Sequence, residues 1–222
     1  MKEKRIFDAP VEVRDASDST ATIEGYAAVF GNSYEIAGMF TESVDPKAFN
    51  KSLRERADEL AVVSFHDADR VLGTVASGTA EFWADERGLK YRSQLDLLDP
   101  DGIGMHRKVL TGKVRQSSFS FEVVKDLWEE REGELPHRTL KEVRLWEASP
   151  VLWGANPETQ VDVSRAVASY AEYRGVDTPA TTIAEIQQIR EATTEEPAVE
   201  PPQALDTTPD QPEPARTFDP YL

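Results

Sequence analysis

Residues 114–124 read VRQSSFSFEVV and form the clearest strand pattern in the chain. Within this stretch three apolar side chains alternate with three polar ones: Phe119, Phe121 and Val123 with Ser118, Ser120 and Glu122. An alternation of period two is typical of a β-strand whose two faces meet different surroundings. We therefore expect one strand here, with the phenylalanines on the opposite face from Ser118.

Short strand-like segments recur on both sides of this stretch. They occupy residues 11–13, 20–30, 60–65, 71–77, 80–83, 89–95, 139–145 and 148–153. Two other segments favour helices: Asp45-Pro46 is a good N-cap and first helical residue, and the segment 103–111 is followed by Gly112. Many short strands with two helices predict an α+β, mainly β domain over residues 1–165, either a barrel or a sandwich.

The composition changes after residue 165. Residues 166–174 and 182–192 can each form a short polar helix, so we interpret residues 166–192 as a polar helical extension. Residues 193–222 contain seven of the chain's fourteen prolines and seven acidic residues, with one basic residue, Arg216. Such a segment buries too little apolar area to offset the entropy of ordering it. We expect a disordered, acidic, proline-rich tail.

Bulk composition excludes several classes of function. The formal net charge of −16 argues against direct nucleic-acid binding, because phosphate contacts need a basic surface. The chain has no cysteine, which excludes disulfides and thiolate chemistry. No stretch approaches the roughly 18 apolar residues of a membrane helix, and the charged start is not followed by a signal-peptide core. We expect a cytosolic protein without a cofactor.

His66 and Ser118 are the candidate base and nucleophile. A serine oxygen becomes a good nucleophile when a nearby base takes its proton, and the pKa of histidine suits that task near neutrality. The chain has three histidines, so few bases are available. Taken singly, each residue is more often structural, and Ser117 and Ser120 leave the identity of a nucleophile open.

Glu147 is the candidate third residue of such a site. It lies between apolar neighbours in LWEASPV, residues 145–151, and a buried carboxylate needs a partner. Glu147 can orient His66 and stabilise its imidazolium form. The alternative is a salt bridge to Arg144 or Lys141.

Metal sites are weaker interpretations of the same residues. His66 with Asp67 and Asp69 lacks the H-E-x-x-H spacing of a zinc helix. The acidic turn at residues 96–102 fails the calcium-loop pattern, because Leu97 and Lys108 occupy positions that need oxygen ligands. We therefore expect no metal site.

A series of short motifs follows the chain in a fixed order. They are GYAAVF (25–30), FTESV (40–44), FHD (65–67), VLGT (71–74), GKV (112–114), SSFSF (117–121), LWEAS (145–149) and ANP (155–157). In this order and spacing the chain resembles the prohead proteases of tailed phages, the capsid maturation proteases distantly related to herpesvirus assemblins. The resemblance covers about residues 23–163.

The resemblance implies a serine endopeptidase on a closed antiparallel β-barrel flanked by short helices. It places the base at His66, the nucleophile at Ser118 and the acidic residue at Glu147, while Ser120 stands where the family has glycine. The implied substrates are the scaffolding protein or the scaffold-like region of the major capsid protein, and the chain itself. The implied location is the immature capsid in the host cytoplasm, and a homodimer is left open.

A protein of another class fits the same pattern. A non-catalytic scaffold or assembly protein on this fold would use its acidic tail to bind capsid subunits. A protease expressed alone should shorten itself at the C-terminal end, whereas a scaffold should stay full length. A metal-dependent hydrolase, the third hypothesis, would lose activity to a chelator.

Overall fold

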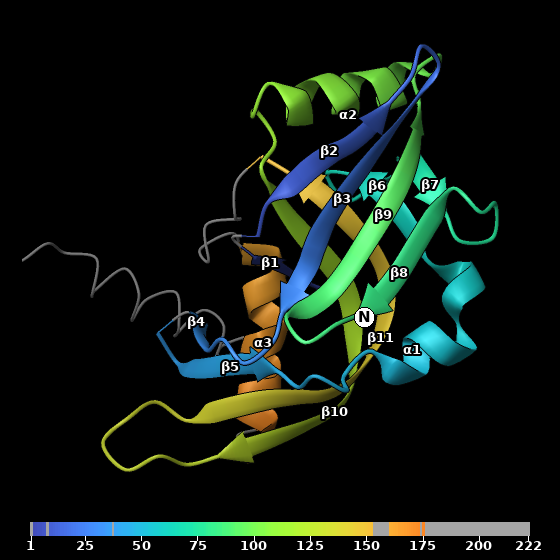
Figure 1. The fold of residues 1–222 in the computed structure, drawn as a ribbon. Helices are drawn as coiled ribbons and strands as arrows, with labels where there is room; N and C mark the ends of the chain where they lie inside the picture. The colour runs from blue at the N-terminus through green and yellow to red at the C-terminus, as the bar shows by residue number, and fades with distance from the viewer. Residues whose placement is uncertain (1, 8, 37, 153–159, 174, 176–222) are drawn as a thin grey trace, which may run out of the picture. The chain divides into compact units, whose positions relative to one another are not determined.

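In the computed structural model, the alternating segment forms part of a long antiparallel hairpin. Its strands are β10 (Gln116–Glu129) and β11 (His137–Val151), which run together in Figure 1. The structure describes residues 2–7, 9–36, 38–152, 160–173 and 175. Contacts divide the chain into two units, Met1–Pro179 and Ala180–Leu222, and every described residue belongs to the first.

The hairpin is the centre of a seven-stranded sheet. Strand β1 (Glu3–Phe7) pairs antiparallel with the other edge of β10. Strands β5 (Phe40–Val44) and β6 (Ala61–Ser64) follow one another along the free edge of β11, both parallel to it. Strand β4 (Tyr34–Ile36) pairs with β5, and β7 (Asp67–Thr74) pairs with β6.

A second, antiparallel sheet covers one face of the first, as Figure 1 shows. Its order is β2 (Val11–Ala16), β3 (Thr20–Val29), β9 (Gly88–Asp96) and β8 (Ala80–Ala84). Both sheets contribute buried side chains to one apolar cluster, which includes Ile23, Leu95, Phe119 and Phe121. Burying one phenylalanine side chain stabilises the fold by roughly 1.5–3 kcal/mol. The alternation of phenylalanine and serine in β10 therefore strongly favours the hairpin.

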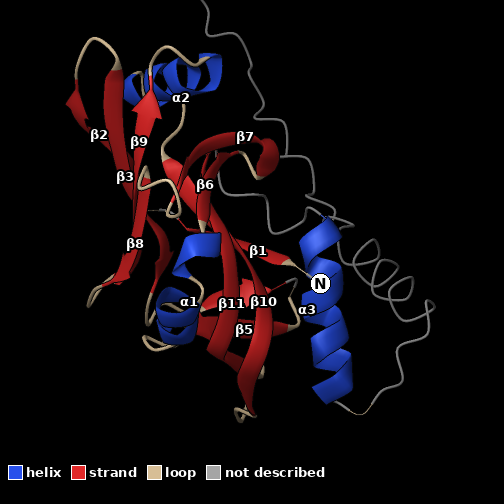
Figure 2. Ribbon diagram, turned by 90° about the vertical axis from the view of Figure 1, so that its right-hand side faces the viewer, coloured by secondary structure: helices blue, strands red, loops and turns tan. Residues whose placement is uncertain are grey.

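Short helices flank the sheets. Helix α1 (Asn50–Glu55) and the 3-10 turn η1 (Ala57–Glu59) connect β5 to β6. Helix α2 (Pro100–Leu110) is capped by Asp99, whose carboxylate accepts from the Asp101 amide, and packs against β2 and β9. Helix α3 (Gln160–Tyr173) contacts β1, and Figure 2 shows it beside the seven-stranded sheet.

The structure corrects the expected closed antiparallel barrel. The described strands form two open sheets, and β11 has parallel neighbours in β5 and β6. The reason is the path of the chain from β5 to β6: after the detour through α1 it returns to the same edge of β11 and keeps its direction. The mainly-β composition with few helices is confirmed.

Several element boundaries also differ from the predictions. Segments 139–145 and 148–153 were expected as two strands, but β11 runs through both. The turn at Asp45 precedes the helix by several residues, and α3 begins at Gln160 rather than 166. The expected helix at 182–192 and the tail at 193–222 lie outside the described residues.

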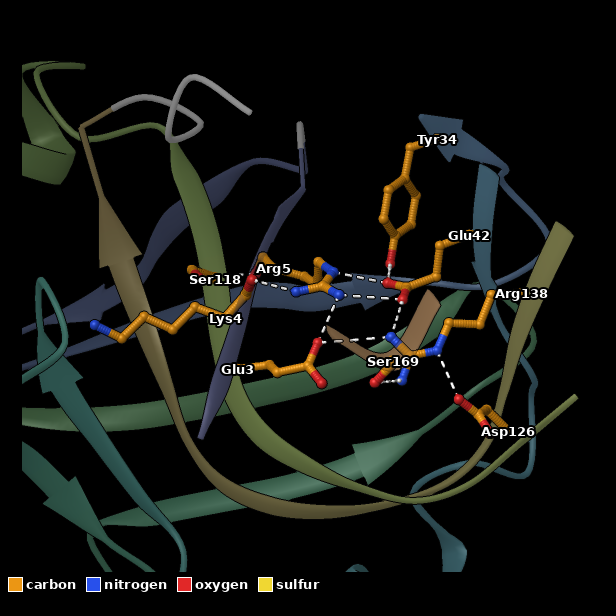
Figure 3. A network of polar contacts seen from close by, with 9 residues as sticks. All are labelled: Glu3, Lys4, Arg5, Tyr34, Glu42, Ser118, Asp126, Arg138 and Ser169. Carbon is orange, nitrogen blue, oxygen red and sulfur yellow. Dashed lines mark hydrogen bonds and ion pairs between the residues drawn. The ribbon is translucent and has the colours of Figure 1, made fainter. Parts of the chain in front are cut away.

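Strand β1 is held by an ion-pair network in the protein interior (Figure 3). Glu42 accepts from Arg5 at 2.7 and 3.1 Å and from Arg138 at 3.1 Å. Arg5 also donates to Glu3 at 2.7 Å, and Arg138 donates to Asp126 at 2.7 Å. Both arginines and Glu42 are buried. Such charges are stable only when every one is paired, so the network fixes β1 against β5 and β11.

Glu42 is ionised because of these arginines. Burial alone would raise the pKa of its carboxyl, but Arg5 and Arg138 outweigh burial and hold that pKa below its ordinary value of 4.5. A carboxyl with a lowered folded-state pKa stabilises the fold above its unfolded pKa, and this contribution disappears as the pH falls through the folded-state pKa.

Replacing Arg138 by methionine should lower the free energy of unfolding by about 3–5 kcal/mol, because it leaves the buried Glu42 with one arginine instead of two and removes the arginine that donates to Asp126. Urea denaturation measures this loss. Arg54→Met is the matched control, since Arg54 pairs with Glu55 at the surface and should have little effect. Equal losses in the two variants would contradict the role given to the network.

Acid should weaken the same network. The stability difference between the wild-type chain and Glu42→Gln should be full above about pH 4.5 and should shrink in acid, where the wild-type carboxyl takes up a proton. Denaturation curves at a series of pH values measure this difference. A difference that stayed constant down to the acid transition would show that Glu42 is not ionised in the fold.

Candidate active site

His66 lies in a strained two-residue turn. Ser64 pairs with Asp67 across the β6–β7 hairpin, so Phe65 and His66 alone connect the strands. Their φ angles are 54° and 62°, and they are the only non-glycine residues with positive φ among the described residues. The left-handed region is costly for side chains with a Cβ, by roughly 1–2 kcal/mol each. Strain of this kind is common at functional sites.

The turn brings His66 against Glu147 of β11. The His66 Nδ1 atom lies 2.6 Å from Glu147 Oε1, and the two side chains are 10% and 13% exposed. A carboxylate only accepts hydrogen bonds, so this contact favours the tautomer of imidazole that has its proton on Nδ1 and its lone pair on Nε2. That Nε2 is buried and has no hydrogen-bond partner in the described part of the chain. The imidazole is therefore oriented by Glu147 on one side, while its other nitrogen is buried without a hydrogen-bond partner.

The surroundings of Glu147 exclude the salt bridges considered from the sequence. No ion pair joins Glu147 to Arg144 or Lys141 among the described residues. Lys141 pairs with Asp45 instead, and the Arg144 guanidinium lies 4.3 Å from the centre of the Trp146 ring.

Ser149 lies between the two members of this pair. Its hydroxyl donates to Glu147 Oε2 at 2.7 Å and accepts from the His66 backbone N–H at 3.1 Å. Ser149 is fully buried. One hydroxyl thus touches both the carboxylate and the turn that carries the imidazole.

The register of the hairpin places Ser118 on the same face of the sheet. Ser118 is directly opposite Ser149, and cross-strand partners point their side chains to the same side. The Ser118 hydroxyl donates to the Arg5 carbonyl of β1 at 2.8 Å. Ser118 is fully buried, and within the described residues no hydrogen bond joins it to His66.

The two neighbouring serines have different surroundings. Ser117 points to the opposite face, where its hydroxyl lies 2.9 Å from the Tyr91 hydroxyl in the core. Burial raises the pKa of Tyr91, so this phenol is neutral and is no base for Ser117. Ser120 lies opposite Glu147 on the Ser118 face. The structure thus excludes Ser117 as a partner of His66 and leaves Ser118 beside Ser149.

The other histidines are not at this site. His137 has both ring nitrogens close to hydroxyls, Thr41 at 2.7 Å and Ser43 at 2.8 Å, and burial lowers its pKa. His106 belongs to α2. The described residues contain no group of three His, Asp or Glu side chains that could hold a metal ion. They also contain no helix long and apolar enough to span a membrane.

Ser149 was assigned no role from the sequence, although its spacing from Glu147 indicated that the two side chains share a face. Glu147 and Ser149 are two residues apart on one strand, so their side chains must share a face. The contact from the Arg5 carbonyl to Ser118 had no such signal, because β1 is far away in sequence and its charged residues do not read as a buried strand.

The chain is similar to known proteins in sequence and in structure. A sequence profile described as caudovirus prohead serine protease matches residues 8–173. A solved structure of the capsid assembly protease gp21 of bacteriophage T4 aligns with a TM-score of 0.40 and 11% identity, covering 68% of this chain and 99% of the T4 chain. No curated protein matches.

The family that the ordered motifs predicted is confirmed, because the matching profile spans most of the chain. It also identifies the protein as a serine peptidase, the class of enzyme that the His66–Ser118 pair suggested. The chain belongs to the prohead serine proteases of tailed phages.

Proposed function

We propose that this capsid maturation protease cleaves peptide bonds with Ser118 as nucleophile, His66 as general base and Glu147 as the residue that orients His66. The observation that carries the proposal is the His66–Glu147 contact of 2.6 Å, which leaves Nε2 without a hydrogen-bond partner. This is the arrangement in which a histidine takes a proton from a serine hydroxyl.

The described arrangement is a resting one. Ser118 Oγ is turned toward β1, on the far side of β10 from β11, and the residue is fully buried. Rotation about the Ser118 Cα–Cβ bond moves Oγ between staggered positions and away from the Arg5 carbonyl.

The chemistry then follows from the positions of the protons. His66 Nε2 takes the proton of Ser118 as Oγ attacks the carbonyl carbon of the substrate, and the resulting imidazolium is stabilised by Glu147. His66 next gives this proton to the leaving amine, which produces an acyl-enzyme. Water, activated by the same imidazole, hydrolyses the ester and restores Ser118.

The proposed substrates are the scaffolding protein or the scaffold-like region of the major capsid protein, inside the immature capsid in the host cytoplasm. The family description, a prohead protease, supports this assignment. The chain itself is a further substrate in the proposal. Its C-terminal sequence, rich in proline and acidic residues, is predicted to be disordered, and a protease needs an extended and accessible segment in its substrate. A homodimer remains a prediction from the family resemblance.

Ser118→Ala should lose at least about 10⁴-fold in peptidase activity, because it removes the proposed nucleophile. The measurements are covalent labelling by a fluorophosphonate and C-terminal shortening of the full chain expressed alone. Both should disappear in the variant.

Ser117→Ala is the matched control for this substitution. It removes the adjacent hydroxyl on the same strand, one that faces Tyr91 and not His66, so labelling and shortening should persist. Cleavage of co-expressed capsid proteins by Ser118→Ala at the wild-type rate would contradict the proposal.

Glu147→Gln should reduce the turnover rate by about 10⁴-fold with little change in stability. An amide can offer its N–H₂ to His66 Nδ1 and so favour the tautomer with the proton on Nε2, which cannot accept the proton of Ser118. Glu147→Asp, which keeps the charge but shortens the side chain, should lose less. The measurement is the rate of fluorophosphonate labelling, and equal rates for the Gln variant and the wild-type chain would remove Glu147 from the mechanism.

A further inference from the structure

We infer that Ser149 is a positioning residue, whose single hydroxyl locks the strained His66 turn and the Glu147 carboxylate into one catalytic geometry. The inference rests on the proposed function of His66 and Glu147. It assigns Ser149 a role beyond the three residues of that proposal, because Ser149 contacts neither the nucleophile nor the imidazole ring through any hydrogen bond described.

The directions of the two hydrogen bonds are fixed by chemistry. The carboxylate cannot donate, so the one hydroxyl proton of Ser149 must point to Glu147 Oε2 at 2.7 Å. The backbone N–H of His66 can only donate, so it must point to the Ser149 oxygen at 3.1 Å. Both bonds are therefore made at once with no competing arrangement.

The contact to Glu147 fixes the carboxylate in the plane that His66 needs. Oε1 faces His66 Nδ1, while Oε2 is held by Ser149. Without Ser149, the carboxylate could rotate about its terminal torsion, which is broad for glutamate. The His66–Glu147 hydrogen bond would then lose its fixed direction.

The contact to the backbone of His66 acts on the strained turn. A turn with positive φ at both Phe65 and His66 persists only when its surroundings specify it. Ser149 is buried, so the His66 N–H would have no water to replace the lost acceptor. The alternative for the turn is to relax toward a less strained backbone, and that movement would carry the imidazole away from Glu147.

The chain contains a matched control for this role. Ser52 is also buried and also uses one hydroxyl twice against β11: it donates to the Val143 carbonyl at 2.8 Å and accepts from the Leu145 N–H at 3.0 Å. Ser52→Ala therefore removes the same number of buried hydrogen bonds from the same strand, away from His66.

The experiment compares Ser149→Ala, Ser149→Thr and Ser52→Ala in the full chain. The first readout is the proton NMR resonance of the His66 Nδ1–H, which a short bond to a carboxylate shifts to low field and which His66→Gln identifies. The second is the rate of fluorophosphonate labelling. We expect Ser149→Ala to lose the low-field resonance and to label about 10- to 100-fold more slowly, as for a misplaced catalytic group. Ser149→Thr, which keeps a hydroxyl, should recover the resonance and most of the rate.

Three outcomes would overturn the inference. One is an unchanged resonance and rate in Ser149→Ala while Ser118→Ala is inactive. Another is an equal loss in Ser149→Ala and Ser52→Ala, which would reduce Ser149 to general stability. The third is failure of Ser149→Thr to recover the resonance in a variant whose unfolding curve matches that of the wild-type chain. Full labelling of Ser118→Ala would instead overturn the proposed function itself.

Discussion

The register of the β10–β11 hairpin is the constraint on which the rest of the structure depends. It sets Ser118 opposite Ser149 and Ser120 opposite Glu147, and the alternation of each strand then places all four on one face. A slip of one residue would send Ser118 to the core and Phe119 to the site. The buried phenylalanines prevent that slip, so the packing of the core also aligns the candidate nucleophile with its partners.

The second determinant is charge inside the protein. Arg5, Glu42 and Arg138 connect β1, β5 and β11, and their mutual pairing makes their burial tolerable. The same residue that anchors β1, Arg5, presents its carbonyl to the Ser118 hydroxyl. The ion-pair network and the candidate site thus share strand β1. A substitution in the network should therefore also affect the site.

The sequence was most informative where a physical pattern is local. The alternation at residues 114–124 predicted β10, and the motif order predicted the family, because both are properties of neighbouring residues. The helix predicted over residues 103–111 begins earlier, at Pro100, with Asp99 as its cap. The barrel was wrong because no local pattern reports that β5 and β6 run parallel to β11. Strand β1 was missed because Arg5, which looks solvated in a sequence, is buried and paired with Glu42, 37 residues away.

In the candidate site, too, local features could be predicted from the sequence and long-range contacts could not. His66, Glu147 and Ser118 could be named from residue chemistry and from the family pattern, but their geometry depends on strand register and on a turn with an unusual backbone. Nothing in Ser64–Asp67 announces that two bulky residues adopt positive φ there. Ser149 is the last residue of the LWEAS motif, but a serine in a sequence gives no indication of its hydrogen-bond partners.

The edge pairings of the hairpin have a consequence for the order of folding. Strands β1, β5 and β6 all pair with β10 or β11, which come last among the described strands. Loops of many residues must close before any of these pairs forms, and such non-local contacts make folding slow. A ribosome therefore releases most of the domain before its central sheet can assemble. The second sheet contains only strands that are synthesised earlier, whereas the site residues of β10 and β11 meet His66 only when the central sheet forms.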